Sequence, residues 1–200
     1  MNKHNFRNGK IECCQICFSK ELEDVLNLGD QPLANTLISS ANKINKFKTY
    51  PINIVRCLKC TLLQMDYIVD QKEVYHPEYP YLPGITLTVN KEQKELAEYL
   101  QDNLNLKENQ IVVDIGSNDG SLLKNFYSMG MKTIGVEPTN IADIANKNGI
   151  NTIQSFFDLK VAKKINNEYG KAKLITSTNV FAHMSTLGDV MDGIVELLDD

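Results

Sequence analysis

Residues 111–123 combine apolar residues, two glycines and carboxylates in a spacing that predicts a cofactor-binding loop. The run Ile-Val-Val-Asp-Ile at 111–115 is typical of a buried strand. Gly116 and Gly120 have no Cβ atom, so the backbone after this strand can turn tightly and lie close to a ligand. Asp114 is at the carboxyl end of the strand, where open α/β sheets bind their ligands.

A second carboxylate lies at the end of the next predicted strand. Residues 133–137 read Thr-Ile-Gly-Val-Glu, and Glu137 is placed to accept hydrogen bonds from both hydroxyls of a ribose. The glycine loop and Glu137 together predict a site for a cofactor that contains adenosine.

The glycine spacing favours S-adenosylmethionine over a dinucleotide. A dinucleotide fingerprint, G-x-G-x-x-G, places a pyrophosphate on a helix N-terminus, but Asn118 stands where its middle glycine would be. Asp114 and Asp119 also put negative charge beside the turn, which repels phosphates but not the sulfonium and ammonium groups of S-adenosylmethionine. The alternative is an ordinary strand and turn that bind no ligand.

The cysteines form a second candidate site. Four of them make two C-x-x-C pairs, Cys14 with Cys17 and Cys57 with Cys60, and four thiolates satisfy a tetrahedral zinc. Such a site has no open coordination position, so the zinc is expected to be structural. Free buried thiols are the alternative, because the two pairs are further apart than in a compact zinc ribbon. Cys13 is expected to be a bystander, since Cys14 gives the correct spacing.

The elements that must position these residues follow from the rest of the chain. Residues 12–66 are expected to form a small zinc-bound module, with a turn at 26–34 between short strands and a strand at 50–57. Three prolines and a glycine at 75–84 predict a tyrosine-rich loop or linker, and the apolar spacing at 86–104 predicts a helix.

From there strands and helices alternate, which predicts a doubly wound, Rossmann-like α/β sheet. The expected strands lie near 111–115, 133–137, 150–154 and 173–178, and the expected helices near 120–129, 140–148, 158–168 and 187–198. The expected domains are a zinc-binding module at 1–74, a linker and covering helix at 75–105, and a cofactor-binding domain at 106–200.

Composition argues against several classes of protein. The 200 residues are 42% hydrophobic and carry a net charge of −4 with scattered lysines, so neither a nucleic-acid nor a membrane partner is expected. No apolar run approaches the roughly 20 residues that span a bilayer. Residues 1–6 also lack the apolar core of a secretory signal, so we expect a cytoplasmic protein.

These motifs, in this order, resemble the sugar C-methyltransferases of the class I S-adenosylmethionine-dependent family. The resemblance rests on the two cysteine pairs, the tyrosine-rich linker, D-I-G-S-N-D-G at 114–120 and N-V-F-A-H at 179–183. It implies C-methylation of a nucleotide-linked 4-keto-deoxysugar, in which a base removes the proton beside the carbonyl and the enolate attacks the methyl group. The expected partner is therefore a small-molecule nucleotide-sugar.

The resemblance spans nearly the whole chain but only the N-terminal half of that family. A seven-stranded methyltransferase sheet needs three strands more than those expected here, and the family's downstream Glu–His pair is absent. An uncovered edge strand is a liability that natural domains avoid, so a fragment, a truncated product or a chain completed by a partner is expected. Activity of the chain alone is left open.

His183, just after the fourth predicted strand, is the candidate catalytic base by this resemblance, since an imidazole pKa of about 6.5 suits proton abstraction at neutral pH; a structural or surface histidine is the alternative. Tyr79 and Tyr81 match the family's active-site tyrosines, whose phenols would donate to the enolate oxygen; packing of the linker is the alternative. Asn179 would orient the cofactor or cap the following turn. Phe157 would contact adenine or pack in the core. The expected cofactor residues are Asp114, Gly116, Ser117, Asn118, Gly120, Glu137, Pro138, Phe157 and Asn179.

Three other classes of protein stay as alternatives. The first is a non-catalytic module that binds zinc and S-adenosylmethionine or a nucleotide, and that needs further segments or a partner. The second is an NAD-dependent oxidoreductase, which Asn118 disfavours. The third is a zinc-ribbon nucleic-acid binder, which the acidic net charge disfavours.

Overall fold

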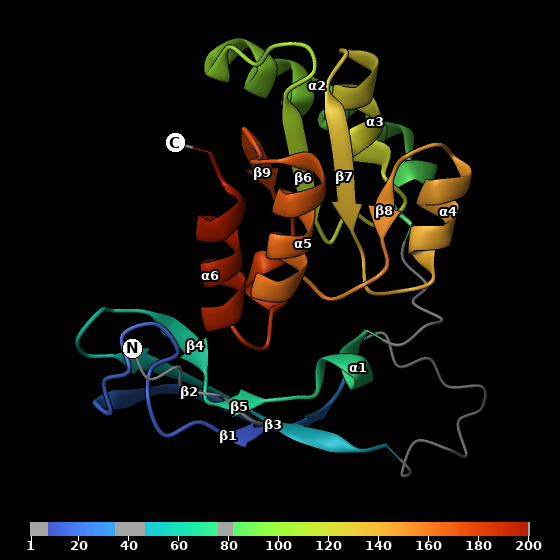
Figure 1. Cartoon of the computed structure of the whole chain (residues 1–200). Helices are drawn as coiled ribbons and strands as arrows, with labels where there is room; N and C mark the ends of the chain where they lie inside the picture. Colours follow the sequence, from blue (N-terminus) through green and yellow to red (C-terminus); the bar gives the residue numbers. More distant parts are fainter. Residues whose placement is uncertain (1–7, 35–46, 76–81, 200) are drawn as a thin grey trace. The chain divides into compact units, whose positions relative to one another are not determined.

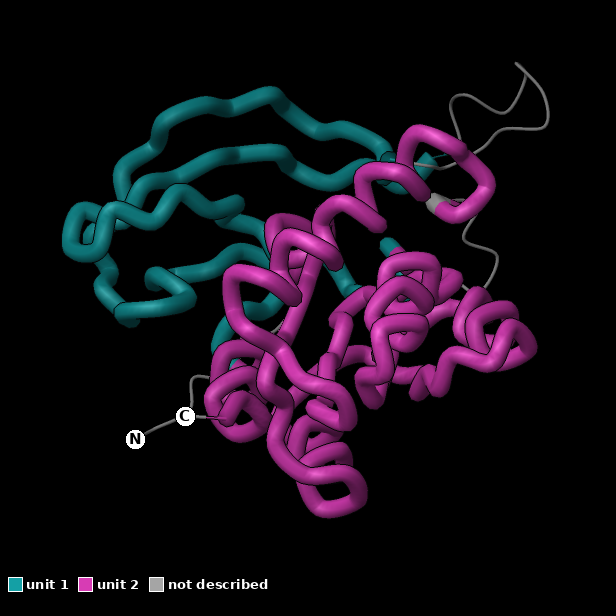
Figure 2. The backbone as a smooth tube through the Cα atoms, turned by 90° about the horizontal axis from the view of Figure 1, so that it is seen from above, with its two compact units in different colours: residues 1–74, 185–188 teal, residues 75–184, 189–200 magenta. Residues whose placement is uncertain are grey.

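The computed structural model describes residues 8–34, 47–75 and 82–199 (Figure 1). No helix of this described part is long and apolar enough to cross a membrane. The contacts divide the chain into two compact units, residues 1–74 with 185–188 and residues 75–184 with 189–200 (Figure 2).

The first unit is built from antiparallel strands, of which β2 and β3 are the longest. Its larger sheet has the order β2-β3-β4, and a smaller one pairs β1 with β5. The bounds are β1 Gly9–Lys10, β2 Leu22–Pro32, β3 Thr49–Cys57, β4 Leu63–Met65, β5 Tyr67–Ile68 and the short helix α1 Gln71–Val74. The strand predicted at 50–57 is confirmed by β3.

The predicted turn at 26–34 is wrong, because β2 stays paired with β3 along its length. The glycine that suggested a turn lies instead in an irregularity of the strand, where the pairing register shifts between Asn27 and Asp30. Gly29 has a φ of 69°, and its N–H donates to Asn27 Oδ1 at 2.8 Å. A bulge of this kind inserts residues into one strand without ending the pairing.

The core of the first unit is small. Almost every residue of β2 is exposed. The buried apolar side chains in the described part of this unit are Ile11, Cys14, Tyr50, Val55, Cys57 and Ile68. This small buried apolar area gives only weak hydrophobic stabilisation. A bound metal is therefore expected to supply much of the stability of the unit.

The second unit is a parallel sheet with helices on both faces (Figure 1). Its strand order is β8-β7-β6-β9, from β6 Ile111–Ile115, β7 Lys132–Val136, β8 Thr152–Ile153 and β9 Leu174–Thr176. The helices are α2 Leu87–Leu104, α3 Ser121–Ser128, α4 Ile141–Lys147, α5 Leu159–Tyr169 and α6 Gly188–Leu197, with short 3-10 turns η2 Pro83–Ile85 and η3 Phe181–His183. The doubly wound α/β pattern is therefore confirmed, with each element within about two residues of its predicted bounds.

Alternate residues of β6 face two separate cores. Ile111, Val113 and Ile115 pack in one cluster with buried residues of α5 and α6. Val112 packs in the other cluster with buried residues of α2, α3 and α4. Successive side chains of a strand point to opposite faces, so a strand covered on both faces needs apolar residues at nearly every position.

The chain after α6 returns to the sheet beside β9. Ala172 and Leu198 form an isolated parallel bridge. Ala172 N donates to Leu197 O at 2.8 Å, and Asp199 N donates to Ala172 O at 2.9 Å. The edge of the sheet on this side therefore carries one further pairing within the described residues.

Candidate zinc centre and cofactor site

The four paired cysteines come together in the first unit. Their Sγ atoms all lie within 4.8 Å of one another. Cys14 Sγ lies 3.5 Å from Cys60 Sγ, and Cys17 Sγ lies 3.4 Å from Cys57 Sγ. Cys57 is the last residue of β3, so the strand carries the second pair to the first and overcomes their separation in sequence.

Both pairs lie in turns of the same geometry. Phe18 N donates to Cys14 O at 3.0 Å, and Thr61 N donates to Cys57 O at 2.9 Å. Phe18 and Thr61 have φ values of 61° and 64°, a left-handed conformation that folds the chain back. The N–H of Cys60 donates to Cys57 Sγ at 3.5 Å. This bond makes the largest contribution, together with hydrogen bonds from neighbouring thiols and the Lys59 N–H, to lowering the pKa of the Cys57 thiol to about 6. Desolvation and neighbouring thiols raise the pKa of Cys60 to about 12, so the turn favours the thiolate, the form that binds metal, at Cys57.

The cluster fits a tetrahedral zinc ion. A Zn–S bond of about 2.3 Å puts the sulfurs of a tetrahedral centre roughly 3.8 Å apart, and the observed separations are close to this value. Four thiolates fill the coordination shell, so the zinc has a structural role. Cys13 is not part of this cluster of four.

The loop after β6 folds back over the end of β7. Gly116, Asn118 and Gly120 have φ values of 72°, 50° and 77°. The N–H groups of Gly116 and Ser117 donate to Val136 O at 2.8 and 3.2 Å. A Cβ atom on Gly116 would lie only 2.6 Å from a methyl group of Val180, so glycine is required there by space as well as by φ.

Glu137 follows β7 and is held by this loop. The residue is only 5% exposed. Oε2 accepts from Asn118 N at 3.1 Å, while Oε1 accepts from Thr139 N at 2.9 Å and from Thr139 Oγ1 at 2.7 Å. Each carboxylate oxygen can accept two hydrogen bonds, so Oε2 has one acceptor position beyond the one used by the described residues.

Asp114 is the second buried carboxyl at this edge of the sheet, 3% exposed at the end of β6. Thr176 Oγ1 of β9 donates to its Oδ1 at 2.7 Å. Burial raises the pKa of Asp114 to about 7, with a smaller contribution from the nearby Glu137 charge, and the Thr176 hydrogen bond opposes the shift.

These residues fit S-adenosylmethionine. β6 and β7 are neighbours with Asp114 opposite Gly135, so the side chains at their carboxyl ends share one edge of the sheet. The free acceptor position of Glu137 Oε2 suits a ribose hydroxyl. A cationic group beside Asp114 would favour its ionised form.

The structure places the other predicted site residues in different surroundings. Ser117 is buried and its hydroxyl has no hydrogen-bond partner within the described residues, whereas Pro138 is half-buried. Phe157 is buried in the cluster beneath α5 and α6. Asn179, with a φ of 55°, and His183, at the end of η3, are both exposed.

Two predicted catalytic residues, Tyr79 and Tyr81, lie outside the described residues. The catalytic role of the third, His183, stays a prediction. The structure adds contacts that the sequence did not predict, those of Thr139 and Thr176 with the two carboxylates. Thr139 carries a local signal, because a threonine two residues after an acid can donate to it through both its N–H and its hydroxyl. Thr176 carries none, since its contact joins two strands.

Two family models match the chain. Residues 89–200 match a model described as a methyltransferase domain, and residues 14–75 match a model described as a zinc binding domain. Over 189 residues the chain is 28% identical to the C-methyltransferase NovU of Streptomyces niveus, covering 94% of this chain and 45% of that relative. The chain therefore spans less than half the length of the relative that it matches.

Solved structures with a similar backbone include two methyltransferases. One is an S-adenosylmethionine-dependent methyltransferase from Anabaena variabilis, with a TM-score of 0.45 and 19% identity over 56% of this chain and 49% of that chain. The other is magnesium protoporphyrin IX methyltransferase from Synechocystis, with a TM-score of 0.43 and 16% identity over 55% of this chain and 54% of that chain.

Proposed function

Because this chain belongs to the methyltransferase domain family and carries a four-cysteine zinc-binding site, we propose that it binds S-adenosylmethionine at the loop after β6 and at Glu137. We propose further that the protein methylates a carbon atom of a nucleotide-linked keto-deoxysugar. The domains proposed for these tasks are a zinc-binding module at 1–74, a linker and covering helix at 75–105, and a cofactor-binding domain at 106–200.

The observation that carries the proposal is the hydrogen bond from Asn118 N to Glu137 Oε2. It joins the glycine loop to the carboxylate, so that a ribose bound at Glu137 would lie against the loop that turns over β7. A dinucleotide is disfavoured at the same place, because Asn118 replaces a glycine and the carboxylate of Asp119 beside the turn opposes a pyrophosphate.

Support for a carbon acceptor comes from the relative that matches most of this chain, which is described as a C-methyltransferase. Support for a nucleotide-linked keto-sugar comes from the resemblance of the loop at 114–120 and the segment at 179–183 to the sugar C-methyltransferases. A carbon beside a carbonyl becomes a nucleophile once its proton is removed, so this reaction requires a base.

When bound, S-adenosylmethionine supplies an electrophilic methyl group. His183 is proposed to take the proton: the C–H bond beside the carbonyl breaks, its electron pair forms the enolate, and the proton goes to an imidazole nitrogen. The exposed side chain of His183 is open to a substrate. Tyr79 and Tyr81 are assigned from the sequence as hydrogen-bond donors to the enolate oxygen. The zinc takes no part in this chemistry, since four cysteines fill its coordination shell.

The proposal is tested by methyl transfer from isotopically labelled S-adenosylmethionine to a nucleoside diphosphate 4-keto-6-deoxysugar, with the zinc-loaded protein. We expect the label on a ring carbon adjacent to the carbonyl, located by carbon NMR of the product. A label on oxygen or nitrogen would contradict the proposed acceptor. Binding of the cofactor without transfer to any keto-sugar would instead favour a non-catalytic binding module.

A further inference from the structure

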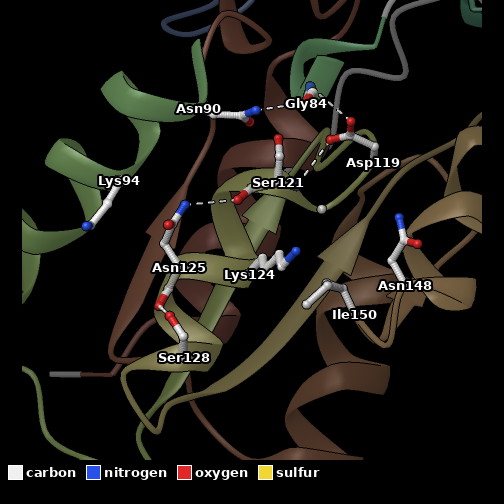
Figure 3. Close-up of a pocket in the computed structure, with 11 residues that line it drawn as sticks. Gly84, Asn90, Lys94, Asp119, Ser121, Lys124, Asn125, Ser128, Asn148 and Ile150 are labelled. Carbon is white, nitrogen blue, oxygen red and sulfur yellow. Dashed lines mark hydrogen bonds between the residues drawn. The ribbon is translucent and has the colours of Figure 1, made fainter. Parts of the chain in front are cut away.

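A hydrogen-bonded contact joins the cofactor loop to the short turn η2, which precedes α2. Gly84 N donates to Asp119 Oδ2 at 3.0 Å, and Ser121 N donates to Asp119 Oδ1 at 3.1 Å (Figure 3). The two oxygens of one carboxylate therefore hold two different elements, η2 and the start of α3. An aspartate that only formed the turn leading into α3, by accepting from the N–H two residues on, would need one of them.

Gly84 is also bound from the other side. Asn90 Nδ2, on α2, donates to Gly84 O at 2.8 Å (Figure 3). A Cβ atom on Gly84 would lie 2.4 Å from Asp119 Oδ2 and 3.1 Å from Asp119 Cγ. No side chain fits at this position unless the aspartate moves, so the contact depends on glycine at 84.

The large apolar side chains described at the end of η2 and the start of α2 are exposed: Ile85 is 79% and Leu87 is 88% exposed. A cavity of about 470 Å³, lined mostly by polar side chains that include Asn125 and Ser128 of α3, opens beside Gly84 and Asp119 (Figure 3). Within the described residues, hydrogen bonds to Asp119 and Asn90 therefore tie Gly84 of η2 to the loop before α3 and to α2.

The main chain at Asp119 and Asn118 is linked to the carboxylate proposed to bind ribose. Asp119 N donates to Asn118 Oδ1 at 2.9 Å, and Asn118 N donates to Glu137 Oε2 at 3.1 Å. Asn118 has a φ of 50°, a conformation that an asparagine tolerates when its neighbours hold it. A continuous series of contacts thus runs from Gly84 through Asp119 and Asn118 to Glu137.

We propose that Asp119 is a positioning residue for the cofactor site: it fastens η2 to the loop after β6 and, through Asn118, holds the loop in the conformation that presents Glu137. The inference rests on the proposed function, because the site it positions is the S-adenosylmethionine site. Coupling of this kind is reciprocal, so cofactor binding should also stabilise η2.

The discriminating variant is Asp119→Ser. A serine hydroxyl can still accept from Ser121 N, as serine does in turns of this type, but it is too short to reach Gly84 N. We expect the dissociation constant for S-adenosylhomocysteine to rise by about 5- to 20-fold. Without cofactor, hydrogen exchange of the amides at 84–90 should be faster than in the unmodified protein, and added S-adenosylhomocysteine should no longer slow it.

Gly84→Ala disrupts the same hydrogen bond at its donor. It should also raise the dissociation constant for S-adenosylhomocysteine and speed exchange at 84–90. Asp158→Ser is the matched control, because Asp158 accepts from Val161 N at 2.8 Å at the start of α5 and serine can keep that bond. We expect affinity and exchange at 84–90 to stay unchanged in this control.

The outcomes separate the inference from the proposed function. If the unmodified protein binds S-adenosylhomocysteine, and Asp119→Ser and Gly84→Ala bind it equally well with unchanged exchange at 84–90, Asp119 only forms the turn before α3 and the inference is wrong. If the unmodified, folded protein binds no S-adenosylhomocysteine, the proposed function is overturned and the inference with it. Exchange of the β6 amides reports whether each variant is folded.

Discussion

Thr176 Oγ1 donates a 2.7 Å hydrogen bond to Asp114 Oδ1, joining the carboxyl ends of β9 and β6 around a buried carboxyl. Both residues are almost fully buried. The hydroxyl satisfies one oxygen of Asp114, yet burial still raises the pKa of this carboxyl to about 7. Burying an ionisable carboxyl lowers the stability of the folded protein at neutral pH. A site that binds a cationic ligand gives a reason to keep such a group at this edge of the sheet.

This cost predicts how stability depends on pH. The folded protein holds the Asp114 proton up to pH of about 7, while the unfolded chain releases it at about 3.9, so the folded state binds more protons between these values. Stability from this group is therefore fully present below about pH 4 and is lost as pH rises to 7. The loss approaches about 4 kcal/mol, at 1.36 kcal/mol per pKa unit.

Asp114→Asn removes the titration but keeps an oxygen for Thr176. We expect the variant to become more stable relative to the unmodified protein as pH rises from 5 to 7.5, measured by urea unfolding. Loss of zinc at low pH affects both proteins equally, so the difference between them isolates Asp114. A difference that does not change with pH would show that Asp114 is ionised when buried.

Glu137 is predicted to bind the ribose. Glu137→Gln removes the charge and one acceptor at nearly constant volume, and we expect affinity for S-adenosylmethionine to fall by roughly 1.5 to 3 kcal/mol, or about 10- to 150-fold. Thr139→Val is the matched control, since it removes one hydrogen bond to Oε1 and leaves both carboxylate oxygens in place. Unchanged affinity in Glu137→Gln would remove Glu137 from the site.

The zinc is predicted to stabilise the first unit. Cys57→Ser should lower the bound zinc below one ion per chain and speed hydrogen exchange of the β3 amides, because this unit has few buried apolar residues. Cys13→Ser is the control and should retain a full zinc content. Full zinc content with native exchange in Cys57→Ser would contradict a site made by these four thiolates.

His183 is predicted to act on the substrate and not on the cofactor. His183→Asn should leave affinity for S-adenosylhomocysteine within about twofold, yet slow turnover by roughly 100-fold. With S-adenosylhomocysteine bound, exchange of the keto-sugar's α-proton with deuterated solvent isolates proton removal and should slow by a similar factor. If the α-proton exchanges at the native rate in His183→Asn, another group is the base that removes it.

The sequence predicted the α/β unit well because its signals are local and redundant. The buried run at 111–115 and the glycines after it specify strand, turn and helix with little help from tertiary contacts. The pairing of distant cysteines was also predictable, since the C-x-x-C spacing is set by the metal. The turn predicted at 26–34 was wrong, because a glycine can adopt a left-handed conformation in a β-bulge as readily as in a turn, and Gly29 does so in a bulge.

The unpredicted part of the site consists of contacts between distant elements. Thr176 and Asp114 are far apart in sequence, and only the strand order β6-β9 brings them together. The second role of Asp119 depends equally on where η2 lies. The sequence left adenine contact and core packing open for Phe157, and its burial in the cluster beneath α5 and α6 agrees with packing.

The central claim, an S-adenosylmethionine site between the loop after β6 and Glu137, is tested most directly by isothermal titration of the folded, zinc-loaded chain. S-adenosylmethionine and S-adenosylhomocysteine are each titrated, with NAD as the comparison. We predict micromolar binding of the first two and no binding of NAD. Binding of NAD alone, or no binding of any of the three by the folded chain, would contradict the account.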